Sequence, residues 1–303
     1  MNPQTVILIV GPTAVGKTAA AVQWARSLQT KIISADSRQC FRELTIGSAK
    51  PSREELQAVH HYFIDSHSIT ETVTAALFEE LALQWASEIF RERQQLVMVG
   101  GTGLYIKAFC EGLDAIPPVD PAIRRQVQAG YEKEGIGWLQ EQVRQADGEF
   151  YAKGETLNPQ RLMRALEVQL STGRPILSFR THRKKERPFQ IRKIGLQLSK
   201  EELHRRIGQR VDQMMEDGLL EEVKRLTPYK DLNALQTVGY SELFRHLEGE
   251  ISLAAAVEEI KKNTRRYAKR QMTWFRKDPS IVWMDARELP GSPGDLPEMV
   301  TQG

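Results

Sequence analysis

One stretch of the chain has residue types and spacing that suit phosphate binding. Residues 11–18 read Gly-Pro-Thr-Ala-Val-Gly-Lys-Thr and match the pattern G-x-x-x-x-G-K-[ST]. In such a loop the glycines let backbone N–H groups turn toward phosphate oxygens, and the following helix adds its positive N-terminal end. Lys17 supplies a mobile charge, and Thr18 supplies a hydroxyl ligand for Mg²⁺. The residues that we expect to bind a diphosphate are Gly11, Thr13, Ala14, Val15, Gly16, Lys17 and Thr18.

The residues that accompany this loop narrow the kind of ligand. Motor and switch NTPases usually carry an acidic residue at the end of a later apolar strand, where it helps to hold Mg²⁺. In this chain the apolar run 96–99 ends in Gly-Gly-Thr at residues 100–102. The loop therefore indicates a di- or triphosphate ligand without indicating that the ligand is ATP.

A carboxylate stands beside the loop in the predicted fold. Asp36 follows the second apolar segment, and the carboxyl ends of parallel strands face the ligand crevice. A carboxylate at that place could take a proton from an incoming nucleophile. Position alone leaves a second interpretation open, in which Asp36 or Ser37 merely caps the next helix.

The elements that must position these residues alternate between strand and helix. The run 5–10 is continuously apolar and predicts a buried parallel strand, which leads into a helix over 17–29. A second helix is predicted within 73–93 from the spacing of its apolar residues. This alternation predicts an α/β fold with a mostly parallel sheet. Further strands are predicted at 31–36, 62–64, 95–99, 191–198 and 281–284.

The pattern changes after Pro117-Pro118, where two successive prolines interrupt regular secondary structure. Residues 121–178 show helical spacing and no convincing strand. Two helix starts carry an N-cap residue followed by proline, at Asp120 and at Asn158. We therefore expect an α/β core at 1–116 and 189–303, interrupted by an all-helical insertion domain at 117–188.

The distribution of charge points to a polyanionic partner. The net charge is only +3, but residues 161–193 hold ten basic residues against two acidic ones, and residues 261–277 hold eight and none. Two cysteines without a C-x-x-C pair argue against a disulfide framework. No apolar run approaches about 18 residues. We expect a cytoplasmic protein that does not cross a membrane.

Two predicted helices concentrate this positive charge. Arg161 and Arg164 are three residues apart and share a helix face. Lys262, Arg266 and Arg270 repeat at four-residue spacing on the helix near the C-terminus. Two interpretations of these basic faces remain open: they bind nucleic acid, or they are ordinary solvated surfaces. The aromatic residues between the basic ones either pack in the core or stack on unpaired bases. These aromatic residues are Tyr267, Trp274 and Phe275.

Several motifs occur in an order that resembles the bacterial tRNA dimethylallyltransferase family, also called tRNA isopentenyltransferase. The resemblance covers nearly the whole chain and implies a P-loop NTPase-like core with an all-helical insertion. One departure is Ser241, where some relatives have a basic residue. Beside the phosphate loop, the motifs are Ser-Ala-Asp-Ser-Arg-Gln (34–39), Ile-Gly-Ser-Ala-Lys-Pro (46–51), Gly-Gly-Thr-Gly-Leu-Tyr (100–105), Asn-Pro-Gln-Arg-Leu-Met-Arg-Ala-Leu-Glu (158–167), Arg-Val-Asp-Gln-Met (210–214), Val-Gly-Tyr (238–240) and Lys-Arg-Gln-Met-Thr-Trp (269–274).

The resemblance also implies a reaction and the residues that perform it. The family transfers a dimethylallyl group from dimethylallyl diphosphate, with Mg²⁺, to the exocyclic N6 amine of the adenine adjacent to the anticodon in tRNA. Its phosphate loop holds the donor's diphosphate. By this resemblance Asp36 is the general base, while Thr102 and Arg210 lie at the reacting groups. The resemblance places against the anticodon stem-loop Asp36, Ser37, Arg38, Gln39, Thr102, Arg124, Gln160, Arg161, Leu162, Met163 and Arg164.

Three other functions remain open from the residues alone. A small-molecule or nucleoside kinase would use the same loop on ATP, with Asp36 as base for a hydroxyl. A prenyltransferase acting on free adenine nucleotides would need neither the insertion nor the basic helix. A nucleotide-gated RNA-binding module would not need Asp36 beside the diphosphate. No apolar helical seam stands out, so we expect a monomer.

Overall fold

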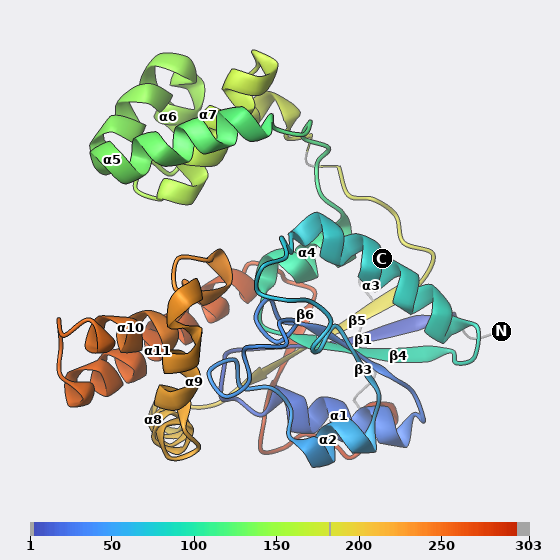
Figure 1. The fold of residues 1–303 in the computed structure, drawn as a ribbon. Helices are drawn as coiled ribbons and strands as arrows, with labels where there is room; N and C mark the ends of the chain where they lie inside the picture. Colours follow the sequence, from blue (N-terminus) through green and yellow to red (C-terminus); the bar gives the residue numbers. More distant parts are fainter. Residues whose placement is uncertain (1–2, 182, 296–303) are drawn as a thin grey trace. The chain divides into compact units, whose positions relative to one another are not determined.

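A six-stranded parallel sheet organises the larger of two compact units. The computed structural model describes residues 3–181 and 183–295. The strand order is β3-β2-β4-β1-β5-β6, and every neighbouring pair is parallel (Figure 1). The carboxyl ends of all the strands therefore lie along one edge of the sheet. The strands are β1 (Thr5–Val10), β2 (Ile32–Ala35), β3 (His61–Tyr62), β4 (Gln95–Gly100), β5 (Gln190–Gln197) and β6 (Ile281–Asp285).

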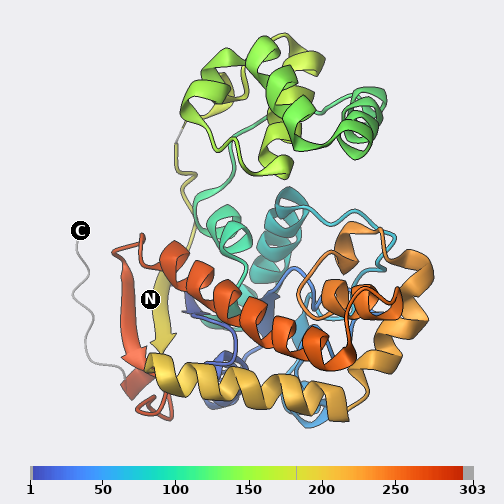
Figure 2. The same cartoon turned by 90° about the vertical axis from the view of Figure 1, so that its left-hand side faces the viewer.

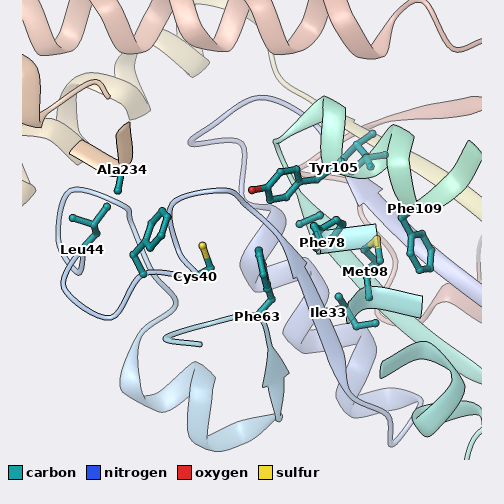
Figure 3. Packing of buried hydrophobic residues seen from close by; sticks show 14 of the residues in the cluster. Ile33, Cys40, Leu44, Phe63, Phe78, Met98, Tyr105, Phe109 and Ala234 are labelled. Carbon is teal, nitrogen blue, oxygen red and sulfur yellow. The ribbon is translucent and has the colours of Figure 1, made fainter. Parts of the chain in front are cut away.

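Both faces of the sheet are covered by helices, as the unbroken apolar strands require. Along β1, Val6, Leu8 and Val10 enter one core cluster, whereas Ile7 and Ile9 enter another. The first cluster includes side chains of α3 (Ala75–Phe90) and α4 (Gly103–Glu111), some of which are drawn in Figure 3. The second includes the apolar side of α1 (Lys17–Ser27). Because successive residues alternate between faces, one strand anchors both layers.

A group of helices follows β5 and approaches the carboxyl edge of the sheet. Figure 2 shows the two long ones, α8 (Lys200–Glu216) and α11 (Leu253–Phe275), lying side by side. Residues of this group, including Val211, Leu219 and Tyr240, pack into the same core cluster as α3 and α4. The shorter members are α9 (Leu219–Leu226), α10 (Tyr240–Leu247) and the 3-10 turns Thr227–Tyr229 and Asn233–Leu235.

The second unit comprises residues 111–185 and has its own core. The unit begins and ends where the backbone N–H of Lys185 donates to the carbonyl oxygen of Glu111 at 2.8 Å. These limits fall slightly before the predicted 117 and 188. Its first helix is kinked at Gly135, which has φ 78° and ψ −170°. Its helices are α5 (Pro121–Ala146), α6 (Gly148–Lys153), α7 (Pro159–Thr172) and the 3-10 turn Ile176–Phe179.

The predicted α/β fold with a mostly parallel sheet is confirmed. The strand predicted at 62–64 is shorter and covers only His61–Tyr62, because Phe63 has φ 65° and leaves the extended conformation. The described elements also include the short helix α2 (Arg53–Ala58) and the 3-10 turn Pro293–Asp295. None of the helices in the described ranges is long and apolar enough to cross a membrane.

Candidate active site

The phosphate-loop motif forms the turn between β1 and α1. Gly11 has φ 146°, and a Cβ atom at this position would lie 2.6 Å from the carbonyl oxygen of Leu196 on β5. Gly16 has φ 104° and stands at the N-cap of α1, where no side chain among the described residues caps the helix. The first backbone N–H groups of α1 are therefore available to an anion.

Lys17 is poised for a negatively charged ligand. Its Nζ donates to the carbonyl oxygen of Pro12 at 2.8 Å, so the side chain folds back over the loop. Burial, and then the positive charge of Arg210, lowers the pKa of Lys17 to about 7, although Asp36 opposes this shift. An anion bound in the loop would restore the positive form of the amine.

Asp36 lies in a turn just beyond β2, where no helix follows. Its Oδ1 accepts hydrogen bonds from the backbone N–H groups of Arg38 at 2.9 Å and Gln39 at 3.3 Å. Within the described part of the chain, no group donates to Oδ2. The interpretation that Asp36 caps a helix is therefore wrong, because its carboxylate stabilises a turn. One oxygen of the carboxylate stays available.

Thr102 joins this turn to the end of β4. Its Oγ1 accepts from the backbone N–H of Ser37 at 3.0 Å and donates to Ser37 Oγ at 3.3 Å. The backbone N–H of Thr102 donates to the carbonyl oxygen of Ala35 at 3.2 Å. Gly100 stands at the end of β4, where motor and switch NTPases usually have an acidic residue. A glycine is needed there because a Cβ atom would lie 2.2 Å from the carbonyl oxygen of Ala35.

Two long-range contacts bring the helical group to the loop. Arg210 on α8 donates from Nη1 to Thr13 Oγ1 at 3.3 Å, and burial lowers its pKa. Gln271 on α11 accepts from the backbone N–H of Thr13 at 2.8 Å and donates from Nε2 to the carbonyl oxygen of Gly101 at 3.0 Å. Sequence reasoning assigned no role to Gln271, although it stands inside one of the quoted motifs.

These groups surround one cavity of about 570 Å³. Its lining combines polar side chains of the phosphate loop, of the turn after β2 and of α8 with the segment 45–51, which contributes three apolar residues, Ile46, Ala49 and Pro51. Gly11 and Val15 do not line it, and neither do Ser37, Arg38 and Thr102, which lie beside it. Of the residues predicted for the site, the lining includes Thr13, Ala14, Gly16, Lys17, Thr18, Asp36, Gln39 and Arg210.

Among the lining side chains that sequence reasoning did not place there are Tyr267 and His61. Burial, and then the charge of Asp36, raises the pKa of Tyr267 to about 12. His61 donates from Nδ1 to the carbonyl oxygen of Val59 at 2.8 Å, and burial lowers its pKa. Of the other aromatic residues on α11, Phe275 packs in the core, and Trp274 is 39% exposed beside basic side chains.

The remaining residues predicted to contact tRNA lie on the second unit. Arg124 on α5 and Arg164 on α7 share the carboxylate of Glu167, at 3.6 Å and 3.7 Å from its Oε2. Gln160 and Arg161 are exposed at the start of α7, and Met163 is half-buried. Leu162 is fully buried in the core of this unit, so its side chain supports the helix from inside.

The fold and the site together define a class of protein. A parallel sheet, a G-x-x-x-x-G-K-[ST] loop at its carboxyl edge and a carboxylate just beyond β2, the next strand along the chain, are features of the P-loop NTPase-like α/β class. A family model described as IPP transferase matches residues 39–278. The chain belongs to the IPP transferase family.

Named relatives and solved structures agree with this membership. The chain is 50% identical to a tRNA dimethylallyltransferase from Christiangramia forsetii over 93% of each chain. It is 45% identical to tRNA dimethylallyltransferase 1 from Bacteroides thetaiotaomicron, over 92% of this chain and 91% of the other. It also resembles the crystal structure of the full-length tRNA isopentenylpyrophosphate transferase from Bacillus halodurans, with TM-score 0.68, 36% identity and coverage of 93% and 90%.

A structure of a eukaryotic dimethylallyltransferase acting on tRNA is similar as well. Its TM-score is 0.75 at 25% identity, over 93% of this chain and 74% of the eukaryotic one.

Proposed function

We propose that this protein transfers a dimethylallyl group from dimethylallyl diphosphate to the N6 amine of the adenine adjacent to the anticodon in tRNA. The observation that carries the proposal is the cavity in which Lys17, Asp36 and Arg210 meet, in a chain of the IPP transferase family. The relatives named tRNA dimethylallyltransferase support the same donor and acceptor.

The arrangement of charges suits a displacement at the allylic carbon. The N6 nitrogen forms a bond to C1 of the donor while the bond from C1 to the diphosphate oxygen breaks, and diphosphate leaves. Asp36 accepts the proton that the amine loses. Negative charge grows on the leaving oxygens, where the loop N–H groups, Lys17 and Arg210 stabilise it most in the transition state. Thr102 is proposed to orient the bridging oxygen from beside Ser37.

Mg²⁺ is the proposed cofactor, and the residues present fit it. Thr18 lines the cavity at the start of α1, and no cluster of three or more His, Cys, Asp or Glu side chains suited to a metal occurs in the described ranges. A single hydroxyl ligand leaves the other positions to diphosphate oxygens and water, which is how Mg²⁺ is often held beside phosphates. When bound, the ion would neutralise charge on the leaving diphosphate.

The tRNA substrate is proposed to use both units. The target adenine must leave the anticodon stack to reach a partly buried donor, which costs a few kcal/mol. Contacts of the arginines on α5 and α7 with phosphates would offset this cost. We further propose that the enzyme acts as a monomer, and in the cytoplasm because its tRNA substrate is found there.

The decisive experiment combines purified protein, unmodified tRNA, Mg²⁺ and dimethylallyl diphosphate, followed by digestion and mass measurement of the nucleosides. The expected product is adenosine carrying one dimethylallyl group. Unmodified adenosine from folded protein, together with ATP consumption in a parallel assay, would point to the kinase alternative. Modification of free adenosine monophosphate in preference to tRNA would instead favour a nucleotide prenyltransferase.

A further inference from the structure

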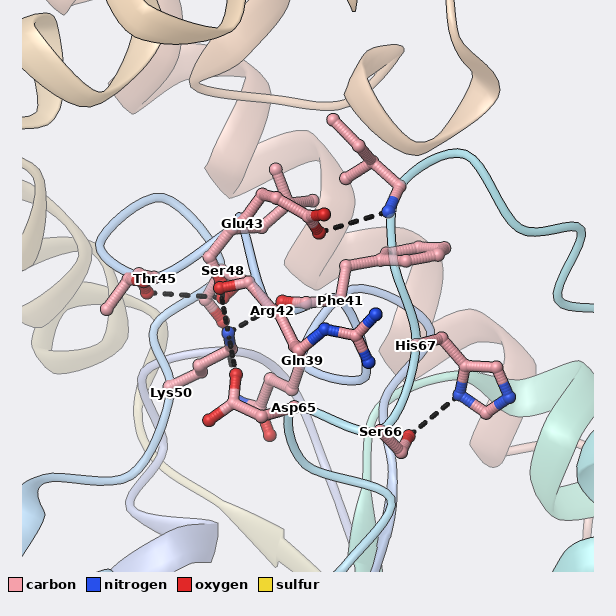
Figure 4. Close-up of polar contacts among 12 residues, drawn as sticks. Gln39, Phe41, Arg42, Glu43, Thr45, Ser48, Lys50, Asp65, Ser66 and His67 are labelled. Carbon is pink, nitrogen blue, oxygen red and sulfur yellow. Dashed lines mark hydrogen bonds and ion pairs between the residues drawn. The ribbon is translucent and has the colours of Figure 1, made fainter.

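The segment 42–51 has no regular secondary structure beyond turns, and its residues from Thr45 to Pro51 contribute to the lining of the cavity. Its two ends are held by polar contacts, and Figure 4 displays those of Lys50. Lys50 donates from Nζ to the carbonyl oxygen of Phe41 at 2.6 Å and to Asp65 Oδ1 at 2.5 Å. Glu43 accepts from the Oγ of Ser68 at 2.6 Å. These contacts fix where the segment starts and ends, but they do not hold its middle.

Two side chains hold the middle. Gln39 donates from Nε2 to the carbonyl oxygen of Ala49 at 2.9 Å, and a buried carboxylate accepts from the residues before it. Glu222 on α9 accepts the backbone N–H groups of three successive residues, at 3.2 Å from Thr45, 2.8 Å from Ile46 and 3.1 Å from Gly47. The hydroxyl of Tyr240 on α10 donates to the same carboxylate at 2.6 Å. Glu222 is only 3% exposed, and no Lys or Arg within the described chain pairs with it.

The ring of Tyr240 also supports the segment from below. Tyr240 is fully buried, and a Cβ atom on Gly47 would lie 2.5 Å from its Cε2. Burial, and then the charge of Glu222, raises the pKa of Tyr240, so the hydroxyl remains a donor at neutral pH. The phenol ring of Tyr240 therefore leaves room only for a glycine at position 47. Its hydroxyl is the fourth donor to the carboxylate of Glu222.

The placement of this carboxylate has a consequence for the cavity. A buried charge without a cation is costly unless hydrogen bonds satisfy it, and removing one of its partners leaves the others unpaired. The donors here are backbone groups of the same segment whose Ile46, Ala49 and Pro51 line the cavity, as does Met214 of α8. The hydrogen bonds of Glu222 therefore fix the backbone from which Ile46 reaches the cavity, and the other apolar residues of the segment follow directly after it.

We propose that Glu222 and Tyr240 are positioning residues that hold the segment 45–51 at the depth suited to a five-carbon donor. This inference rests on the proposed function, since it assigns these apolar residues to the prenyl chain of the donor. Neither residue touches the reacting atoms. Their effect is on donor affinity and on discrimination against longer prenyl diphosphates.

The test uses the full chain with two single variants. In Glu222→Gln an amide N–H₂ replaces one oxygen and meets backbone donors. Tyr240→Phe removes one hydroxyl and keeps the ring. We expect the KM for dimethylallyl diphosphate to rise about tenfold, the effect of losing about 1.4 kcal/mol. The KM for tRNA and kcat should change little, and the relative kcat/KM for geranyl diphosphate should rise.

Two further variants separate positioning from general loss of stability. Glu79→Gln alters another buried carboxylate of the same unit, which pairs with Arg187 at 2.9 Å and does not line the cavity. It should lower the melting temperature without changing donor selectivity. Gly47→Ala should reproduce the effect on selectivity while leaving Glu222 unaltered, because the added methyl group meets the ring of Tyr240. Gly47→Ala also provides the test of donor selectivity if Glu222→Gln does not fold.

The outcomes distinguish this inference from the proposed function. If the unaltered protein prenylates tRNA and the folded variants keep its donor KM and donor selectivity, the positioning role is refuted and the function stands. If the unaltered protein yields no prenylated tRNA, the proposed function fails, and the assignment of a prenyl donor to this cavity fails with it. Equal rises in the KM for donor and for tRNA in Glu222→Gln, with donor selectivity unchanged as expected for Glu79→Gln, would also refute positioning.

Discussion

At the scale of single residues, Asp36 meets two demands with one carboxylate. Oδ1 stabilises the turn through the N–H groups of Arg38 and Gln39, and Oδ2 stays available for the proposed proton transfer. This division allows the chemical role to be removed without removing the structural one. An asparagine keeps an oxygen that can accept both N–H groups, but it is not a base at neutral pH.

Asp36→Asn should therefore lower kcat about 10²–10⁴-fold, which is the usual size of a general-base contribution. Donor binding should persist, because the turn and the phosphate loop are kept. Single-turnover kinetics with saturating donor and tRNA measure the effect. Asp231→Asn, an exposed carboxylate on the same unit, is the control and should keep full activity. A loss of tRNA affinity with an unchanged rate for bound tRNA would make Asp36 a positioning residue.

Lys17 leads to a prediction about pH. With a pKa of about 7 in the free protein, Lys17 is mostly uncharged at pH 8. A bound diphosphate stabilises the charged amine and raises its pKa, so binding takes up a proton. Donor affinity should then fall as pH rises above 7, by up to about tenfold per unit, until the pKa of the complex is reached.

Calorimetry in two buffers of different ionisation enthalpy measures this proton uptake directly at pH 8. Lys17→Met should abolish the uptake along with most of the affinity. An uptake of zero by the unaltered protein would show that Lys17 already carries its charge before the donor binds.

At the scale of elements, α11 connects two loops that belong to different strands. Gln271 ties the phosphate loop after β1 to the glycine turn after β4, and a Cβ on Gly101 would lie 2.2 Å from its Nε2. A helix near the end of the sequence therefore sets the distance between the two sides of the diphosphate site. Its position depends on packing against α8 and on side chains such as Phe275 in the core.

Gln271→Leu should leave a half-buried N–H of Thr13 and a buried carbonyl of Gly101 without partners. The expected loss is about 1–3 kcal/mol in the free energy of unfolding, accompanied by weaker donor binding. Urea denaturation and donor titration measure the two effects. Gln84→Leu, on an exposed position of α3 in the same unit, should change neither. Unaltered stability and donor affinity in Gln271→Leu would show that the hydrogen bonds of Gln271 to Thr13 and Gly101 do not support the site.

At the scale of the whole molecule, the two units divide the proposed work. The larger one holds the cavity, and the smaller one presents Arg124 and Arg164 around Glu167. If these arginines contact phosphates of tRNA, their contribution depends on salt and is the same for every tRNA.

Arg164→Gln should weaken tRNA binding and reduce the slope of log affinity against log salt concentration by about one. Binding of dimethylallyl diphosphate should remain unchanged. Arg144→Gln on the same unit, where Arg144 pairs with Glu141 at 2.7 Å, is the matched control. A loss confined to particular tRNAs, with an unchanged salt slope, would indicate base contacts in place of phosphate contacts.

The sequence by itself determined the features that depend on neighbours along the chain. The phosphate loop, the strand before it and the capped helix after Asn158 all follow from local spacing and from the backbone preferences of glycine and proline. The parallel sheet follows from the alternation of strand and helix patterns, and the change in pattern predicts an insertion at 117–188, where the structure has a unit at 111–185.

Only the tertiary structure decided which distant residues meet. Gln271 lies 258 positions from Thr13, and Glu222 lies 176 positions from Ile46, yet each pair is joined by a hydrogen bond of 2.8 Å. No local pattern encodes such pairs, because they depend on the strand order and on how α8–α11 pack against the carboxyl edge of the sheet. Glu222 in particular has the sequence signature of an exposed helix residue, and only burial beside Tyr240 turns it into an anchor for the cavity.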